Sequence, residues 1–268
     1  MKANMKLFFE FYKALLKSQM EYRFNFSIDM VINLFKYFVT YATIALLLKR
    51  FHHIGSWSYD QVLFLFTLNL LTYGIASAIF NNPMKSIGHL VHTGEFDSIL
   101  IRPLNPFFHV MIKQYYLGFF AHVAMGLFLL VHSLLRLSVE WTLWKGTLLV
   151  LMIIGGSLIQ SSVLIFSGTL SLKLVKAQGV MQLFNYKLRA FIDYPLEIYP
   201  PFIRIFLTFI VPYAFANFYP AQYLLGKPGL YFPTAVLPFI TMVAGAVLFG
   251  ASYLFFFRSI KSYTSTGT

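Results

Sequence analysis

The apolar residues of this chain gather in long stretches that polar segments separate. A helix needs about 20 mainly apolar residues to cross the roughly 30 Å hydrocarbon core of a bilayer. Six stretches meet this requirement and predict six transmembrane helices, at about 25–48, 61–80, 114–135, 146–171, from 203 onward, and 235–257. The fifth contains Pro212 and Pro220, so we expect its outer end to bend or re-enter the membrane.

Two shorter segments have an amphipathic helical pattern. In residues 5–20 the apolar side chains fall on one helical face and the charged ones on the opposite face. This pattern predicts a helix lying in the membrane interface, although the first turns of a longer spanning helix would look similar. Residues 178–193 form the second such segment, within a predicted polar connection over 172–202. The predicted organisation is an N-terminal connecting helix (1–24), a six-helix membrane domain (25–257) and a polar tail (258–268).

Composition supports a membrane protein and weakens other classes. The chain is 58% hydrophobic and 11% charged, whereas about a quarter of the residues in ordinary soluble domains are charged. Its net charge of +12 is spread between apolar spans, which favours contact with anionic lipid headgroups over binding of nucleic acid. The chain has no Cys, so disulfides and thiolate metal sites are excluded.

The distribution of Lys and Arg predicts the orientation. With six spans both termini lie on one side of the membrane. Fifteen of the 21 basic residues fall on that side and Lys36 lies within a span, while five fall on the other side, namely Lys49, Arg50, Arg136, Lys145 and Lys227. The positive-inside rule then makes both termini cytoplasmic, together with the connections 81–113 and 172–202.

Polar residues within the first predicted span form a candidate lining for a transport pathway. They recur every three or four residues and so share one helical face: Asp29, Asn33, Lys36 and Thr40. Ionisable groups inside a membrane usually face the interior of a bundle or a water-filled path. Alternatively, Asp29 lies at the interface and Lys36 extends its charge toward it.

The chain lacks the motifs of an enzyme. It has no phosphate-binding G-x-x-x-x-G-K-[ST] loop, no H-E-x-x-H zinc motif and no G-x-S-x-G nucleophile elbow. The adjacent His52 and His53 point apart and predict a solvated loop rather than a metal site. We therefore expect no catalytic residue, no metal and no cofactor on this chain, so energy for transport would come from another subunit or from ion coupling.

One polar segment has a pattern that suits docking to a soluble partner. Residues 94–106 read GEFDSILIRPLNP and combine two acids, an arginine and two prolines. The prolines cannot continue a helix, so the pattern predicts a short amphipathic helix with a sharp end. An ordinary loop helix resting on lipid headgroups is the alternative.

This segment resembles the G-x-[LF]-D-x-x-L-[LI]-R-P-x-N-P signature of the bacterial ABC-2 family of ABC transporter permeases. A second stretch, Tyr194–Gly226, is similar to the late region of that family, where YP, a proline within the span, YPA and LLG recur. The loop Trp57–Asp60 also fits. The subfamily that the chain resembles usually has paired permease subunits.

The resemblance implies an all-α exporter fold in the bacterial cell membrane. ABC-2 permeases form dimeric pores, and each half couples to a separate ATP-binding subunit that holds ATP and Mg²⁺. A heterodimer with a second, related permease is favoured over a homodimer, and no nucleic-acid partner is expected. The implied ATPase interface is a coupling helix with the matched positions Gly94, Glu95, Asp97, Arg102, Pro103, Asn105 and Pro106. Residues 178–193 are a weaker candidate for a second coupling element.

Two other functions remain compatible with the sequence. An ion-coupled secondary transporter would need inverted repeats and intramembrane carboxylates, of which Asp29 is the only well-placed example. A membrane scaffold or immunity protein without transport would have a similar composition, but it would leave the matched cytoplasmic segment without a purpose. Loss of ATPase binding on mutation of Arg102 or Asp97 would favour the exporter.

Overall fold

The computed structural model describes residues 53–113, 120–174 and 177–264, together with scattered positions between 27 and 46. The scattered positions are helical, while the predicted pathway residues Asp29, Asn33, Lys36 and Thr40 and the predicted connecting helix lie outside the described residues. The elements in chain order are β1 His53–Ile54, β2 Trp57–Ser58, α3 Tyr59–His92, α4 Glu95–Leu100, α5 Pro106–Lys113, α6 Phe120–Arg136, α7 Leu143–Thr169, η2 Leu170–Leu172, α8 Gln178–Gln182, η3 Leu183–Leu188, η4 Phe191–Asp193, η5 Leu196–Ile198, α9 Pro201–Ile205, η6 Phe206–Ile210, α10 Ala214–Leu224, η7 Thr234–Val236 and α11 Leu237–Lys261.

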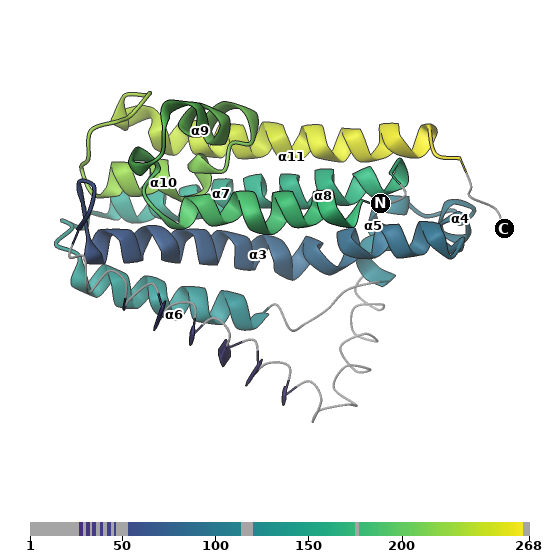
Figure 1. The fold of residues 1–268 in the computed structure, drawn as a ribbon, viewed down its shortest axis with the longest axis horizontal. Coiled ribbons are helices and arrows are strands. Elements are labelled where there is room, and N and C mark those ends of the chain that lie inside the picture. Colours follow the sequence, from purple (N-terminus) through teal and green to yellow (C-terminus); the bar gives the residue numbers. More distant parts are fainter. Residues whose placement is uncertain are drawn as a thin grey trace.

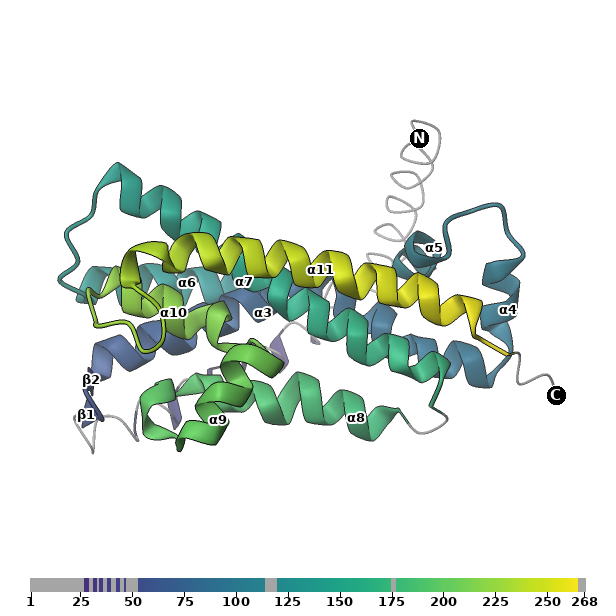
Figure 2. The same ribbon diagram turned by 90° about the horizontal axis from the view of Figure 1, so that it is seen from above.

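The long helices lie side by side in an elongated bundle (Figures 1 and 2). Within the described ranges, three helical stretches are long and apolar enough to cross a membrane: α3, α7 with η2, and η7 with α11. A bent pair, Pro201–Ile210 with Ala214–Leu224, would make a fourth if it were one span. These helices confirm the predicted all-α polytopic membrane fold.

The bundle has two distinct ends. One end, called here the hairpin end, carries the antiparallel β1–β2 hairpin and the α6–α7 connection, and an ion pair between Arg136 and Asp60 (3.8 Å) joins them. The other end, called here the α4 end, carries α4, α5 and the end of α11 (Figure 1). Local signals begin the helices at the hairpin end: Ser58 and Gln61 form a capping box on α3, and the Thr142 hydroxyl accepts from the Lys145 amide at the start of α7.

Helix α3 is longer than predicted. We expected a polar connection from residue 81, but the helix continues through Pro83 to His92. Its extension packs in the bundle, because Met84, Ile87 and Leu90 are buried. Apolar contacts thus keep this part helical despite the polar residues around position 82.

Small residues bring α7 close to its neighbours. A Cβ atom on Gly155 would lie 2.8 Å from the backbone oxygen of Thr241 in α11, and one on Gly156 would lie 2.8 Å from that of Ala216 in α10. On α11, Ala246 and Gly250 both face outward, and Gly250 has nothing within 4 Å. Gly245 makes the contact with Gly155 instead.

The second amphipathic segment crosses the bundle instead of lying at its end. Residues 178–193 are helical throughout and run along α7 in the opposite direction, away from the α4 end (Figure 2). Hydrogen bonds join Ser167 to Asn185 (3.2 Å) and Asn69 to Asp193 (2.6 Å). At 1.5 Å per residue the 16 residues extend about 24 Å. Contrary to the prediction, residues 172–202 are therefore not one connection at a single end of the bundle, because the chain passes along them from the α4 end to the hairpin end.

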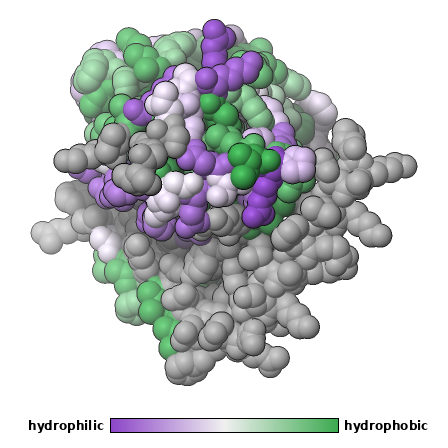
Figure 3. Space-filling view, turned by 90° about the vertical axis from the view of Figure 1, so that its right-hand side faces the viewer, coloured by the Kyte–Doolittle hydropathy of each residue, from purple (hydrophilic) through white to green (hydrophobic). Residues whose placement is uncertain are grey.

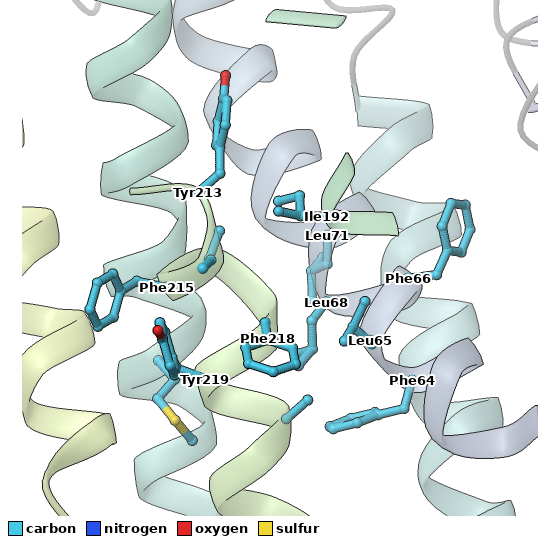
Figure 4. Packing of buried hydrophobic residues seen from close by; sticks show 14 of the residues in the cluster. Phe64, Leu65, Phe66, Leu68, Leu71, Ile192, Tyr213, Phe215, Phe218 and Tyr219 are labelled. Atoms are coloured by element: carbon cyan, nitrogen blue, oxygen red, sulfur yellow. The ribbon is translucent and has the colours of Figure 1, made fainter. Parts of the chain in front are cut away.

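The predicted fifth span is a re-entrant pair at the hairpin end. Its two helices, Pro201–Ile210 and Ala214–Leu224, meet at an angle of 106° with Pro212 at the break. Both ends of the pair stay near the hairpin, since Glu197 and Lys227 each contact Ser56. Figure 4 shows aromatic residues of α10 and its entry packed among leucines of α3 and Ile192. The predicted bend was correct, but the chain passes from the α4 end toward the hairpin end along residues 178–193, before this pair.

Candidate coupling surface

The predicted docking segment begins at a sharp turn after α3. Gly94 has φ of +71°, in the left-handed region that glycine adopts without strain, and its amide donates to the Val91 carbonyl (3.2 Å). Helix α4 follows directly and ends at Leu100, before Pro103. The sequence therefore produces the short, sharply ended helix that its pattern predicts.

Two apolar side chains anchor α4 to the bundle. Phe96 and Ile99 are both buried, and the Phe96 ring meets the ring of Tyr263 edge-on, with centroids 5.3 Å apart. They belong to a cluster that includes Leu90 of α3 and Phe256 of α11. Helix α4 is consequently held against both the first and the last long helix of the described bundle.

The tip of α4 is exposed. Ile101 is 84% exposed, and Arg102 and Pro103 beside it are exposed as well. Glu95 is exposed and Asp97 is half-buried on the same short helix. Figure 3 shows that hydrophilic residues gather at this end of the molecule with apolar residues among them. An apolar side chain next to an arginine is a combination typical of protein interfaces.

The last part of the segment has a structural role that the sequence reasoning missed. Asn105 caps α5, because its side-chain oxygen accepts from the Phe107 amide (3.0 Å) and its backbone oxygen accepts from that of His109 (3.0 Å). Its amide group also approaches the Tyr253 hydroxyl of α11 (3.4 Å). Pro106 begins α5, where its missing N–H costs nothing. The predicted interface thus divides into an exposed tip at 101–103 and a support at 105–106.

A second cluster of contacts closes the hairpin end. The Ser56 hydroxyl donates to Glu197 (2.8 Å), and the Lys227 ammonium donates to the Ser56 carbonyl (2.8 Å) and lies 4.8 Å from the centre of the Trp57 ring. Trp57 is fully buried against Phe218. These contacts connect the segments before and after the re-entrant pair to the start of α3.

The connection that enters the re-entrant pair is also fixed internally. Arg204 donates to the backbone oxygens of Glu197 and Tyr199, and the Tyr199 hydroxyl donates to the Phe191 carbonyl (2.9 Å). Burial raises the pKa of Tyr199 to about 12, so this hydroxyl remains a donor at neutral pH. These contacts hold the connection before the re-entrant pair in place at the hairpin end.

A polar network lies between these two ends, and sequence reasoning missed it. Asn69 of α3 donates to Asp193 (2.6 Å) and accepts from Gln160 of α7 (3.0 Å). Asn217 of α10 donates to the Ile192 and Leu65 carbonyls (2.5 and 3.1 Å). The available signal was three polar residues, Asn69, Gln160 and Asn217, in otherwise apolar stretches.

A model of the ABC-2 family of transporter proteins matches residues 34–267. The chain belongs to the ABC-2 transporter family. No curated protein matches the chain.

Membership of the ABC-2 family makes this multi-pass membrane protein a permease component of an ABC transporter. Permeases of this family generally work with an ATP-binding subunit. Within the described residues, no cluster of three or more His, Cys, Asp or Glu side chains could hold a metal ion. The α4 tip is exposed, and the buried residues that precede it pack with residues of α3 and α11.

Proposed function

We propose that this ABC-2 permease is half of the translocation pathway of an ATP-driven exporter, and that the ATP-binding subunit docks on the α4 tip. ATP and Mg²⁺ would be held by that partner. The α4 end would face the cytoplasm of a bacterial cell, and a second, related permease subunit would complete the pathway. The pairing of unlike permeases is an expectation from the resemblance of the sequence to that subfamily.

The observation that carries this proposal is the way in which the exposed α4 tip (residues 101–103) is attached to the bundle. Ile101 and Arg102 are exposed, yet they follow directly after Phe96 and Ile99, which are buried against α3 and α11. A push on the tip therefore acts on two long helices through closely packed side chains, which transmit displacement because protein interiors compress little. A surface loop without buried side chains would deform under the same displacement and would not transmit it to the helices.

The charges of the described residues also favour a cytoplasmic α4 end, but by a smaller margin than the sequence predicts. Six basic residues lie near this end, namely Lys85, Arg102, Lys113, Lys173, Arg258 and Lys261. Four lie near the hairpin end, namely Arg136, Lys145, Arg204 and Lys227. Arg204 was assigned to the cytoplasmic side from the sequence, but it lies near the hairpin end because residues 178–193 run from the α4 end toward the hairpin end. Lys187 and Arg189 belong to that segment and are therefore counted at neither end.

A pull-down from the native membrane tests the proposal. The chain would be solubilised in mild detergent, and the co-purifying proteins would be identified. We expect a P-loop ATPase with the wild type, and a loss of at least about tenfold in its yield with Arg102→Glu, because close charge pairs at interfaces couple strongly. Ile101→Glu should have the same effect.

Arg136→Glu is the matched control, since it makes the same charge change at the hairpin end. Its exposed ion pair with Asp60 contributes only about 0–1 kcal/mol, so this variant should stay folded and keep the ATPase. Absence of any ATPase from the folded wild type would refute the exporter proposal and favour an ion-coupled transporter or a scaffold. If Arg102→Glu and Ile101→Glu both gave the same ATPase yield as the wild type, the proposed docking of the ATPase on the α4 tip would be refuted.

A further inference from the structure

An arginine lies within the crossing segment, well away from both ends of the bundle. Arg189 follows η3, and its guanidinium stacks on the ring of Tyr73 in α3, with 3.9 Å between its central carbon and the ring centre. Its Nε donates to the Asn185 carbonyl (3.3 Å), which is the only hydrogen bond of Arg189 to the described part of the chain. Its two terminal nitrogens are thus available to bind another group.

The tyrosine beneath this arginine has an unused hydroxyl. Tyr73 is only 4% exposed, and its buried oxygen has no close hydrogen-bond partner among the described residues, since the Tyr186 hydroxyl interacts with it only at longer range. A buried polar group without a partner costs about 1–3 kcal/mol, so such groups are rare unless they serve a ligand or water. The hydroxyl and the guanidinium therefore belong to one stacked pair of side chains.

Arg189 is half-buried, on a segment that has both a buried and an exposed face. The buried residues of the crossing segment are Met181, Asn185 and Ile192, whereas Gln182, Leu183, Tyr186 and Lys187 are exposed. Lipid tails cannot solvate amides or charges, and polar residues in spans usually face a protein or an aqueous path. The exposed face of residues 178–193 is consequently suited to a pathway rather than to lipid.

The local charges favour an anion. The one acid of the segment, Asp193, is part-buried and already accepts a hydrogen bond from Asn69, which in turn accepts from Gln160. The segment carries two cations, Lys187 and Arg189, for this single carboxylate, and Arg189 interacts electrostatically with Asp193. One positive charge therefore remains unbalanced within the crossing, where an isolated charge is costly and a bound anion would neutralise it.

We propose that Arg189 and the Tyr73 hydroxyl bind the phosphate or carboxylate headgroup of an amphiphilic anion that this permease transports. The guanidinium would hold two oxygens of the headgroup in parallel, and the Tyr73 hydroxyl would donate to the same group. Lys187 would attract the anion into the path. The role as cargo rests on the proposed export function, but binding itself can be measured without the ATPase.

Binding of dodecyl phosphate to the purified chain in phosphatidylcholine nanodiscs tests this site. Empty nanodiscs correct for partition into lipid, and dodecyltrimethylammonium and dodecanol, with the same chain, test the headgroup. We expect a clear preference for the phosphate. Arg189→Gln should weaken its binding by at least about tenfold, as expected for a hydrogen bond to a charged group.

Tyr73→Phe separates binding from folding. Because the hydroxyl has no close hydrogen-bond partner among the described residues, its removal should leave the melting temperature unchanged while lowering the affinity for dodecyl phosphate about fivefold, as for one hydrogen bond. Arg258→Gln, an exposed arginine at the end of α11, should change neither quantity. Unchanged affinity in both Tyr73→Phe and Arg189→Gln, or equal binding of all three probes, would overturn the proposal.

The lipid composition distinguishes a cargo from a resident lipid. Phosphatidylglycerol has the same phosphate chemistry, so the titration would be repeated in nanodiscs that contain it. Little displacement of dodecyl phosphate would support a cargo site, whereas one-for-one displacement would assign the site to a bilayer lipid and overturn its role in transport. If the anion binds but no ATPase co-purifies with the chain, this site stands and the exporter proposal fails.

Discussion

The close approach of α7 and α11 predicts a large effect from a single added methyl group. In Gly155→Ala, the new Cβ would lie 2.8 Å from the backbone oxygen of Thr241 and 3.0 Å from two backbone atoms of Met242. The first distance is 0.6 Å shorter than the 3.4 Å at which ordinary contact begins. No flexible side chain can move aside, so the two helices must separate.

The magnitude follows from a comparison with Gly250→Ala on α11. Both substitutions gain helix propensity of about 0.8–1 kcal/mol, but Gly250 has open space around it and Gly155 does not. Overpacking costs about 1–3 kcal/mol. We therefore expect the two variants to differ by about 2 kcal/mol, which is on the order of 4–8 °C in melting temperature for a chain of this size.

The assay is thermal unfolding of the purified chain in one detergent. Membrane proteins often unfold irreversibly, so all variants must be heated at the same rate. Gly245→Ala should behave like Gly155→Ala, because its Cβ would meet the Gly155 carbonyl from the other side. Equal melting temperatures for Gly155→Ala and Gly250→Ala would refute this description of the α7–α11 contact.

Three further predictions follow from individual contacts. Phe96→Ala should lower the stability by about 3–5 kcal/mol through loss of a buried ring, whereas Ile101→Ala should change the melting temperature little. Asn217→Leu should lower it by about 1–3 kcal/mol, because the Leu65 and Ile192 carbonyls lose their shared donor. Because the chain has no Cys, an impermeant maleimide applied outside intact cells should label Ile198→Cys at the hairpin end and not Ser98→Cys on α4; the reverse labelling would contradict the proposed orientation.

The apolar pattern predicted most of the fold because long helices follow directly from hydropathy. The predicted spans at 61–80, 146–171 and 235–257 all lie within long helices, and the short helix before Pro103 is present. The segment 178–193 was misplaced for a physical reason. Its charges indicate a cytoplasmic location until their partners, Asn69 and Tyr73, are known, and these lie more than a hundred residues earlier in the chain.

The candidate site divides in a similar way. The signature residues Gly94 to Pro106 predicted where an exposed tip would lie, but the pattern could not separate Arg102, which is exposed, from Asn105, which caps α5. Nor could it identify Ile101, because an isoleucine in an amphipathic helix is normally assigned to the buried face. Those distinctions depend on which side of α4 meets α11, which only the packing determines.

The polar character of residues 178–193 has a consequence for biogenesis. Lys187, Arg189 and Asp193 would each cost up to about 2.5–3.5 kcal/mol at the centre of an isolated helix, so this segment should enter a bilayer poorly by itself. The helices that supply Asn69, Tyr73 and Gln160 are synthesised before it. Insertion of the segment should therefore wait for α3 and α7, and a chain truncated of α3 should leave residues 178–193 on the side of the membrane where they were made.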